Sequence, residues 1–242
     1  MCGRFVVKSA TEVIRDMFGE YEQIEQYEPS FNVAPSNQAP VFLKSKGKKQ
    51  RRNLTWGLVP FFAKDPKAGF KMINARAETI HKLPSFRNPF RRQRCAVAAD
   101  GFYEWRRVGE AKVPYYIHLK SGAPMVFAGI YDHWKKPEGG HLSTFSIATV
   151  PANELLAEIH NHKKRMPAVI GQDGDLDRWM DNGLEDPEQL LPVLRPIPDG
   201  ELAAHIVTRD VNSPKNNHAD LISPADDAYV SKVYGEVPGL KL

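Results

Sequence analysis

The residue with the most distinctive chemistry is Cys2, which follows the initiator methionine. Removal of an initiator methionine before a small residue is common, and it would leave Cys2 with a free α-amine beside its thiol. Such a 1,2-aminothiol reacts with an aldehyde in two steps: the amine forms a Schiff base, and the thiol then closes a thiazolidine ring. An α-amine with a pKa of about 7.7–8.0 is roughly one-tenth neutral at pH 7, far more than a lysine side chain. Taken alone, a cysteine here is more often part of an ordinary chain end.

Polar side chains alternate with apolar ones in the stretch Met72–Glu78. In an extended segment this alternation places Asn74, Arg76 and Glu78 on one side, so that an amide, a cation and a carboxylate point together. The stretch therefore predicts either a polar site or a half-buried strand whose polar face meets water.

A further carboxylate, Glu104, lies among large aromatic residues in the stretch Gly101–Trp105, shortly after the apolar run Cys95–Ala99. If the aromatic rings exclude water from it, Glu104 is suited to general acid–base chemistry. The alternative is an exposed edge strand whose aromatic rings point the other way. Cys95 itself is interpreted as a core residue, since it lies in an apolar strand.

Two imidazoles, His160 and His162, are followed by three cations that end at Arg165. This combination suits proton transfer near a phosphate backbone, and one of the two histidines is interpreted as a structural hydrogen-bonding residue. A zinc site is the obvious alternative interpretation of the two histidines. No other Cys or His cluster has the spacing of a ligand set, so we predict no metal site.

Basic residues concentrate in two clusters. The first contains no acidic residue and is interpreted as the solvated tip of a hairpin: Lys44, Lys46, Lys48, Lys49, Arg51 and Arg52. The second combines two aromatic residues, Phe86 and Phe90, with four arginines: Arg87, Arg91, Arg92 and Arg94. Aromatic residues between arginines suit single-stranded nucleic acid, because bases stack on rings and phosphates pair with guanidinium groups.

The stretch from Trp56 to Phe62 has two interpretations, an aromatic platform or wedge and a piece of buried core. Its rings are Trp56, Phe61 and Phe62.

The whole chain has 242 residues, of which 42% are hydrophobic, so it can bury a sizeable core. Its net charge of +4 is too small to establish a nucleic-acid partner. Two cysteines without a Cys-x-x-Cys pair indicate a reducing compartment and no disulfide scaffold. With neither a secretory signal nor a long uncharged apolar run, we expect a cytoplasmic or nucleoid-associated protein without a membrane span.

The elements that must position these residues are mostly strands. Alternating, β-branched or aromatic runs predict strands at Pro40–Leu43, Leu54–Val59, Cys95–Ala99, Phe102–Arg107, Tyr115–Leu119, Met125–Tyr131 and Thr144–Thr149. Helices are predicted from Ser9 to about Phe18, from Pro151 to about His160, and from Asp186–Pro187 onward; residues 29–40 are predicted to be irregular. Because no βαβ alternation is visible, we expect an α+β fold with a mostly antiparallel, barrel-like β core and peripheral helices. We expect one domain over residues 1–230 and a tail over 231–242.

Together and in this order, the motifs resemble the SOS response-associated peptidase (SRAP) family, the abasic-site processing proteins. The matching stretches are Met1–Arg4, Phe31–Pro35, Trp56–Pro60, Asn74–Glu78, Gly101–Trp105, and Ile159–His160 through Arg165–Pro167, with a looser match over Val207–Asn217. This resemblance implies loss of Met1 and a covalent thiazolidine link between Cys2 and the opened sugar of an abasic site in single-stranded DNA. The link would shield the lesion from strand cleavage.

The resemblance also implies roles for individual residues. Asn74 would orient the Cys2 end, Glu104 would act as the acid–base carboxylate, and His160 would promote opening of the sugar ring. Cationic and aromatic residues would contact DNA: Arg4, Arg76, Arg87, Arg91, Arg165, Trp56, Phe61 and Phe62. We expect a monomer that uses no cofactor.

The chain departs from one common form of the family, in which a single residue separates the histidine from Arg-Met-Pro. Here residues 161–164 intervene, so His162 competes for the catalytic role. His160 is preferred because Ile-His precedes this point in the family pattern, and because a helix that ends there would fix its direction.

Two other functions fit part of the sequence. An N-terminal-nucleophile amidohydrolase or peptidase would use the Cys2 thiol against an amide, with its own amine as base. It would form an acyl-enzyme and gives no reason for the aromatic and arginine clusters. A non-covalent module that binds single-stranded nucleic acid would need only the basic and aromatic surfaces, and it explains neither Cys2 nor Glu104.

Overall fold

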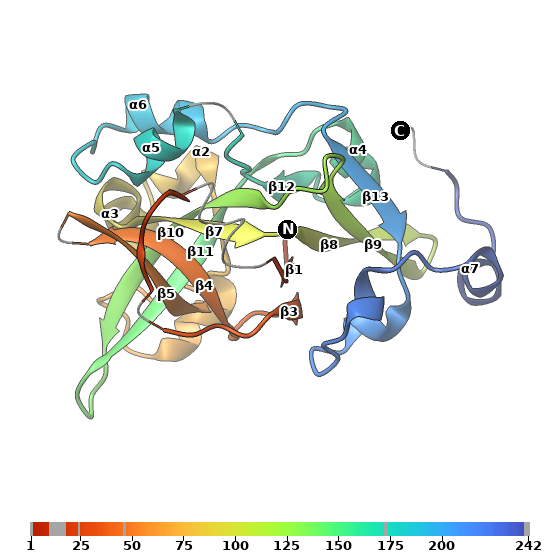
Figure 1. Ribbon diagram of the computed structural model, residues 1–242, viewed down its shortest axis with the longest axis horizontal. Coiled ribbons are helices and arrows are strands. Elements are labelled where there is room, and N and C mark those ends of the chain that lie inside the picture. The colour runs from red at the N-terminus through yellow and green to blue at the C-terminus, as the bar shows by residue number, and fades with distance from the viewer. Residues whose placement is uncertain (1, 10–17, 24, 46, 172–173, 240–242) are drawn as a thin grey trace.

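A closed barrel of five strands forms the centre of the computed structural model, which describes residues 2–9, 18–23, 25–45, 47–171 and 174–239 (Figure 1). The strands of the barrel are β4 (Gln38–Ser45), β5 (Lys48–Trp56), β7 (Arg94–Ala99), β10 (Met125–Lys135) and β11 (His141–Pro151). They follow the order β5-β4-β7-β10-β11 with antiparallel neighbours. A parallel pairing of β11 with β5, at Thr144–Thr55 and Phe145–Trp56, closes the ring.

A second, five-stranded antiparallel sheet lies against the barrel. Its order is β13 (Leu202–Ile206), β9 (Ala111–Leu119), β8 (Gly101–Val108), β1 (Arg4–Val7) and β3 (Ser30–Val33). The chain passes from β7 of the barrel into β8 of this sheet with Asp100 alone between them. Any group carried by β8 is therefore held close to the barrel.

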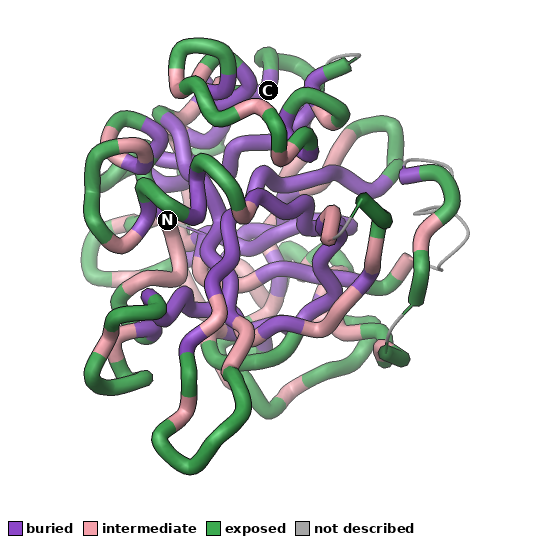
Figure 2. The backbone as a smooth tube through the Cα atoms, turned by 90° about the vertical axis from the view of Figure 1, so that its left-hand side faces the viewer, coloured by how far each residue is buried: buried purple, intermediate pink, exposed green. Residues whose placement is uncertain are grey.

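Short elements surround the two sheets. The remaining strands are β2 (Glu22–Gln23), β6 (Asn74–Arg76) and β12 (Arg165–Pro167). The helices are α2 (Ala77–Ile80), α3 (Pro84–Arg92), α4 (Glu154–Ile159), α5 (Asp175–Met180), α6 (Pro187–Leu190) and α7 (Asp227–Tyr234). Among the described residues there are also four 3-10 turns: η1 (Pro66–Lys71), η2 (Leu191–Val193), η3 (Arg209–Asn212) and η4 (Ala219–Ile222). Buried backbone is concentrated in the central strands, while the loops and turns around them are largely exposed (Figure 2).

The barrel core is filled by aromatic rings that also join it to the second sheet. Phe5 of β1 packs edge-on against Trp56 at 5.0 Å between ring centroids and against Phe127 at 6.2 Å. Phe102 of β8 contacts the same Phe127 at 5.9 Å. Edge-to-face pairs of this kind stabilise a core beyond the area that they bury. The first strand of the chain is thereby anchored in the barrel interior.

The predicted fold class is confirmed: the structure is α+β, with an antiparallel, barrel-like core and peripheral helices. All seven predicted strands are present, although most extend further than predicted. The interval 29–40 is not irregular throughout, since it contains β3 and the start of β4. Strands β1 and β13 were not predicted, because their pairing partners lie far away in the sequence.

The helix predictions had mixed outcomes. Asp186 caps α6 as predicted, since its side chain accepts a hydrogen bond from the Glu188 N–H. Pro151, however, ends β11, and α4 begins only after Asn153, whose side chain accepts from the Leu156 N–H. The helix predicted from Ser9 falls on residues 10–17, which lie outside the described residues. The division into residues 1–230 and a tail stays a prediction; its boundary falls inside α7.

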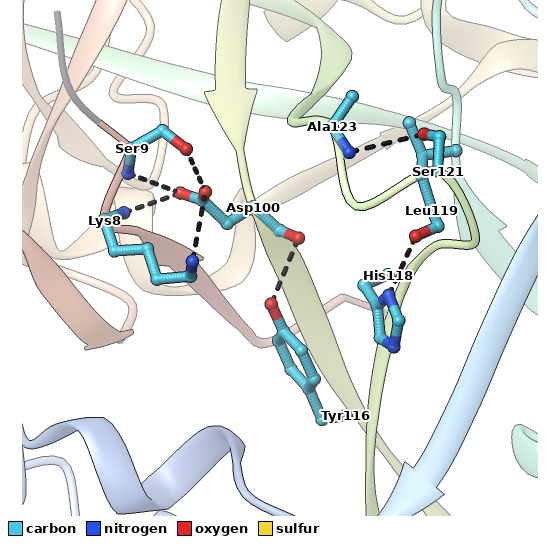
Figure 3. Close-up of polar contacts among 8 residues, drawn as sticks. All are labelled: Lys8, Ser9, Asp100, Tyr116, His118, Leu119, Ser121 and Ala123. Atoms are coloured by element: carbon cyan, nitrogen blue, oxygen red, sulfur yellow. Dashed lines mark hydrogen bonds and ion pairs between the residues drawn. The ribbon is translucent and has the colours of Figure 1, made fainter. Parts of the chain in front are cut away.

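Asp100 ties the end of β1 to the junction between the barrel and the second sheet (Figure 3). Its carboxylate, in a residue 8% exposed, accepts hydrogen bonds from the Lys8 N–H at 2.6 Å, from the Ser9 N–H at 2.9 Å and from the Ser9 hydroxyl. Its carbonyl accepts from the Tyr116 hydroxyl at 3.1 Å, and its N–H donates to the Val6 carbonyl at 2.8 Å. One carboxylate thus holds the strand that starts next to Cys2.

We expect Asp100→Ala to lower the free energy of unfolding by about 2–4 kcal/mol, because it removes the buried, charged acceptor of three hydrogen bonds from Lys8 and Ser9. Urea unfolding measures the change. The matched control is Asp186→Ala, which removes only a helix cap and should cost about 1 kcal/mol. Equal losses for the two variants would contradict the role assigned to Asp100.

Candidate active site

Cys2 is fully buried at the point where the N-terminal strand enters the core. The Asn74 side-chain amide donates a hydrogen bond to the Cys2 carbonyl at 2.8 Å. The Cys2 sulfur lies 3.7 Å from the Arg4 carbonyl, to which the thiol can donate. Burial raises the pKa of the Cys2 thiol well above its usual value, and the nearby Glu104 carboxylate raises it further. The thiol is therefore protonated at neutral pH in this state.

Asn74 is held by β6, which pairs in parallel with β11 at Asn74–Ile147 and Arg76–Thr149. While its side-chain nitrogen contacts Cys2, its side-chain oxygen is buried and has no hydrogen-bond partner among the described residues. Asn74 therefore has an acceptor to spare beside Cys2.

The predicted extended segment through Glu78 is wrong in its second half. The strand β6 ends at Arg76 and the chain turns at once into α2, so that Glu78 lies on a helix. Arg76 is exposed, and Glu78 forms an ion pair with Arg165. Of the three polar residues predicted to point together, Asn74 alone contacts Cys2.

Glu104 and His160 form a buried acid–base pair. They are 4% and 2% exposed, and the His160 Nδ1 lies 3.9 Å from the Glu104 Oε1. Burial lowers the pKa of His160, while the Glu104 carboxylate and a hydrogen bond with the Arg165 backbone act in the opposite direction. The imidazole is thus neutral at neutral pH and able to accept a proton.

The backbone around His160 selects its tautomer. His160 directly follows α4, and its N–H donates to the Leu156 carbonyl at 2.8 Å. Its Nδ1 lies 2.9 Å from the Arg165 carbonyl and 3.3 Å from the Arg165 nitrogen. The shorter contact favours the form in which Nδ1 carries the proton and donates, which leaves Nε2 as the proton acceptor.

His162 has a different environment from His160. The two rings meet edge to face at 5.1 Å, but His162 is exposed. Both line a cavity of about 390 Å³ together with Ile73, Glu104, Trp105, Arg107, Lys112 and Lys163. His160, and not His162, is the histidine buried next to Glu104. The structure therefore brings Cys2, Asn74, Glu104 and His160 together in one place.

Two cavity-lining cations, Arg107 and Lys112, were not singled out from the sequence, whereas Trp105 and Lys163 belong to stretches that were. The Trp105 indole donates to the Asn212 side chain at 2.8 Å, which fixes the ring beside the C-terminal segment. Arg107 and Lys112 face each other across β8 and β9. A hairpin pairing over Gly109 and Glu110 was the signal in the sequence that could have found this pair.

Arg165 does not have a free guanidinium group. It is 8% exposed, and it donates to both oxygens of Glu78, at 2.5 and 3.0 Å, and to the Thr149 carbonyl at 2.6 Å. The same ion pair holds the pKa of Glu78 below its usual value. Arg165 therefore joins β12 to β11 and α2, and the DNA contact predicted for it is not available in this arrangement.

Two aromatic predictions are corrected by burial. Trp56 is 1% exposed, and its indole donates to the Ile73 carbonyl at 2.8 Å, so it belongs to the core and not to an exposed platform. Within α3, Phe86 and Phe90 are buried on the inner face, while Arg87 and Arg91 are exposed on the outer face. The interleaved pattern thus records an amphipathic helix, with rings inward and cations outward.

Two arginines of the N-terminal and basic regions are committed to backbone carbonyls. Arg94 is fully buried and donates to the carbonyls of Phe90, Arg91, Trp179, Asp181 and Leu184. Arg4 donates to the Asn32 side chain at 2.9 Å and to the Val211 carbonyl at 2.8 Å. Arg4 is only partly buried, so an edge of its guanidinium group faces solvent.

The aromatic residues Phe61 and Phe62 are exposed as predicted, at 59% and 52%. Phe70, 64% exposed, was not predicted and belongs to the same loop between β5 and β6. The loop narrows where Gly57 touches Gly69: a Cβ on Gly57, whose φ is +122°, would lie 2.7 Å from the Gly69 oxygen. This contact leaves no room for a side chain larger than that of glycine at Gly57 or Gly69.

Three buried side chains hold this loop between β5 and β6, the aromatic loop, by hydrogen bonds to its backbone. The Asp132 carboxylate accepts from the Phe61 N–H at 2.9 Å, and the Thr144 hydroxyl accepts from the Val59 N–H at 2.8 Å. The Trp134 indole donates to the Ala63 carbonyl at 2.7 Å. The exposed rings are thus presented by an ordered loop.

None of the helices in the described part of the chain is both long and apolar enough to cross a membrane.

Comparison with known proteins gives one consistent result. The model of the SOS response associated peptidase (SRAP) family matches residues 1–214. The chain is 41% identical to the abasic site processing protein YoqW of Bacillus subtilis over 92% of its own length and 99% of that protein. It is 31% identical to the abasic site processing protein HMCES of Gallus gallus, over 93% of this chain and 78% of that one.

The fold is shared with a crystal structure of a protein from Bacteroides thetaiotaomicron. The TM-score is 0.82 at 28% sequence identity, and the match covers 93% of this chain and 100% of the other.

We expect Asp132→Ala to loosen the aromatic loop, because the Phe61 N–H loses its charged acceptor. Trypsin cleavage after the exposed Lys64 and Lys67, followed by mass spectrometry, should become about tenfold faster as the loop opens more often. The control is Asp199→Ala, which removes an acceptor for the Glu154 N–H far from the loop and should leave these cleavages unchanged. Equal cleavage in Asp132→Ala and the unmodified protein would show that Asp132 does not hold the loop.

Proposed function

Since the chain belongs to the SRAP family, we propose that it processes abasic sites in single-stranded DNA by linking them covalently to Cys2. Removal of Met1 would free the Cys2 amine, and the product would be a thiazolidine that shields the lesion. The protein would act as a monomer and without a cofactor. The observation that carries the proposal is the gathering of Cys2, Asn74, Glu104 and His160, of which Glu104 and His160 line a cavity.

The reaction begins with an abasic sugar in its closed, hemiacetal form. This form is unreactive until the bond between C1′ and the ring oxygen breaks to give an aldehyde. His160 accepts the proton of the anomeric hydroxyl through Nε2, and the developing charge on the ring oxygen is quenched by a proton delivered through Glu104. The neutral imidazole and buried carboxyl group observed here suit that exchange.

The neutral Cys2 amine then attacks C1′, and water leaves to give a Schiff base. The Asn74 side chain, which already holds the Cys2 carbonyl, has a buried oxygen able to accept a hydrogen bond from this amine. Such a contact would aim the nitrogen lone pair at the aldehyde. Holding the amine and lesion together also supplies an effective concentration that free amines in solution lack.

The thiol closes the ring in the last step. Its raised pKa means that the sulfur arrives as a thiol, so its proton must pass to a base as the carbon–sulfur bond forms. Glu104, whose charge acts on the thiol, is placed to receive it. Overall one water is released, and two new bonds join C1′ to the nitrogen and sulfur of Cys2.

Closure of the thiazolidine ring explains why the DNA strand at the lesion is protected and not cleaved. An open Schiff base promotes β-elimination of the 3′ phosphate, because its iminium group acidifies the neighbouring C2′. Addition of sulfur removes the iminium and with it the driving force for elimination. The thiol thus converts a potential lyase into a protein that shields the lesion.

Exposed aromatic and cationic side chains support a single-stranded partner. The rings of Phe61, Phe62 and Phe70 offer stacking surfaces that tolerate any base, and Arg76 is exposed at the end of the strand that carries Asn74. Arg87 and Arg91 add exposed cations on α3. These six residues supply the stacking and phosphate contacts of the proposal.

The first test is the intact mass of the purified protein, before and after incubation with a single-stranded oligonucleotide that carries one abasic site. We expect a protein without Met1 and a denaturation-resistant adduct at protein plus oligonucleotide minus one water. Cys2→Ser keeps the amine and should give strand cleavage without the stable adduct. The control Cys95→Ala alters the other buried cysteine and should still crosslink. Retention of Met1, or a heat-stable adduct of normal yield from Cys2→Ser, would refute the mechanism.

The pH dependence of crosslinking should follow the amine and not His160. Over pH 6–8 the neutral form of His160 is favoured more than that of an ordinary histidine, because burial lowers its pKa. The Cys2 amine, with an ordinary pKa of about 7.7–8.0, gains free base over the same range, so the rate should rise about tenfold from pH 6 to 7.

Rapid-quench kinetics on the His160→Gln variant separate the two groups. We expect a rate about 100-fold lower at every pH, with the acid limb of the profile unmoved. A limb that shifts or disappears in His160→Gln would mean that the histidine, and not the amine, sets the pH dependence.

A further inference from the structure

Three cations line the mouth of the active-site cavity: Arg107, Lys112 and Lys163. All three are exposed, and Glu104 is the one acidic residue among the groups that line the cavity. Within the described part of the chain none of the three takes part in a salt bridge. The proposed chemistry of Cys2 assigns them no role.

Two of these cations come from one hairpin. Arg107 of β8 lies directly opposite Lys112 of β9, on either side of the turn at Gly109 and Glu110. The pairing of β1 with β8 reaches only to Tyr103, so the outer edge of β8 carries no strand at Arg107. That edge is therefore open to another partner.

The third cation is brought there by the loop that follows His160. The Asn161 side chain occupies the open edge of β8, where its nitrogen donates to the Arg107 carbonyl at 2.8 Å and its oxygen accepts from the Arg107 N–H at 3.2 Å. The loop closes with a hydrogen bond from the Lys164 N–H to the His160 carbonyl at 2.8 Å. Lys164 adopts a left-handed φ of +50°, a conformation that a lysine rarely takes. A side-chain clasp and a tight turn thus place Lys163 next to Arg107.

The positive field at this point acts on a neighbouring group. The pKa of His162 is lowered by burial and then by the charges of Arg107 and Lys163, with His160 contributing between them. His162 is consequently neutral at neutral pH. The positive charge at the rim, that is, at the mouth of the cavity, comes from Arg107, Lys112 and Lys163. Three like charges around one opening favour an anionic ligand there.

We propose that Arg107, Lys112 and Lys163 bind a backbone phosphate adjacent to the abasic sugar. The inference rests on the proposed function: a sugar that reaches Glu104 and His160 carries a phosphate on each side, and these must lie toward the mouth of the cavity. A guanidinium fork with two flexible ammonium groups matches a phosphodiester in charge and in hydrogen-bond donors. Asn161 is a positioning residue for this subsite, since its clasp sets the place of Lys163.

The subsite differs from the phosphate contacts that the sequence suggested. Arg165 is occupied by Glu78 and Thr149, and Arg4 is tied to Asn32 and to the C-terminal segment. The rim is instead assembled from a strand pair and a loop, and its residues are free of such internal partners in the described structure.

The first experiment measures crosslinking rate against the concentration of an abasic single-stranded oligonucleotide for the unmodified protein and Lys163→Gln. At about 0.1 M salt we expect the half-saturating concentration to rise about three- to tenfold in Lys163→Gln, with an unchanged rate at saturation. The slope of log affinity against log salt should fall by about 0.7, the value for one lost phosphate contact on a single strand. The control Lys120→Gln, just past the other end of β9, should change neither quantity.

A second experiment identifies the phosphate. A neutral methylphosphonate replaces, one at a time, the phosphodiesters on the 5′ and 3′ sides of the lesion. In the unmodified protein one replacement should raise the half-saturating concentration, and in Lys163→Gln that same replacement should have little further effect. Asn161→Ala, which removes no charge, should reproduce the loss seen in Lys163→Gln while its thermal unfolding stays within a few degrees of the unmodified protein.

The outcomes separate the subsite from the chemistry. If the unmodified protein crosslinks but Lys163→Gln matches it in half-saturation and salt slope, the phosphate subsite is wrong while the function of Cys2 stands. Equal, additive effects of the methylphosphonate and Lys163→Gln at both positions would also overturn it. An unmodified protein that forms no adduct at all would instead refute the proposed function.

Discussion

Strand β11 is the constraint on which the active site depends, because the segments that position Asn74 and His160 are aligned along it. One edge of β11 pairs with β5 and then, further along, with β6. The other edge pairs with β10 and then with β12. On the first edge the chain must leave β5, form the aromatic loop and return in register at Asn74. On the second, the pairing of Thr149 with Pro167 fixes the short segment between α4 and β12, and thus the place of His160. Asn74 and His160 lie far apart in the sequence, yet β6, which carries Asn74, and β12, which follows His160, both pair with Thr149 of β11.

Burial shifts the pKa values of Cys2 and His160 in the active site. In water a thiol and an imidazole would titrate almost independently of a carboxylate, but here the Glu104 carboxylate changes the pKa of both. The Glu104 carboxylate disfavours a second negative charge on Cys2 and favours a proton on His160, while burial disfavours charge on both. The outcome is a neutral thiol and a neutral imidazole around one acidic residue. A site in this state can accept and return protons at its own side chains, which is what the proposed condensation of an amine and a thiol with an aldehyde requires.

The sequence predicted the parts of this arrangement that depend on local pattern and missed those that depend on distant partners. Alternation over Phe102–Arg107 and Thr144–Thr149 was sufficient to find β8 and β11, because their side chains are sorted by burial. Spacing in the sequence does not show that the chain turns into a helix after Arg76, or that Arg165 pairs with Glu78. Both features depend on the contact of α2 with β11 and β12. Phe86 and Phe90 were misjudged because rings between arginines fit a nucleic-acid surface and an amphipathic helix equally well. The grouping of Arg107 and Lys112 with Lys163 escaped notice because a hairpin and a loop contribute these cations separately, and the Asn161 side chain joins the two segments.

A chain end is usually the least ordered part of a domain, and the proposed chemistry demands the opposite. An amine and a thiol on adjacent carbons exist together only on a cysteine at the start of a chain, so the fold has to bury its own N-terminus. It does so by placing β1 in the middle of a sheet, between β8 and β3, instead of at an edge. Arg4 then reaches across to Asn32 and to the carbonyls of the C-terminal segment, while the Asn32 side chain donates to Val211, Ser213 and Asn216. Residues about two hundred positions away thereby hold the strand that presents Cys2. This explains why the segment Val207–Asn217, which carries none of the proposed reacting groups, resembles the family at all: the reactive start of the chain needs its end to keep it in place.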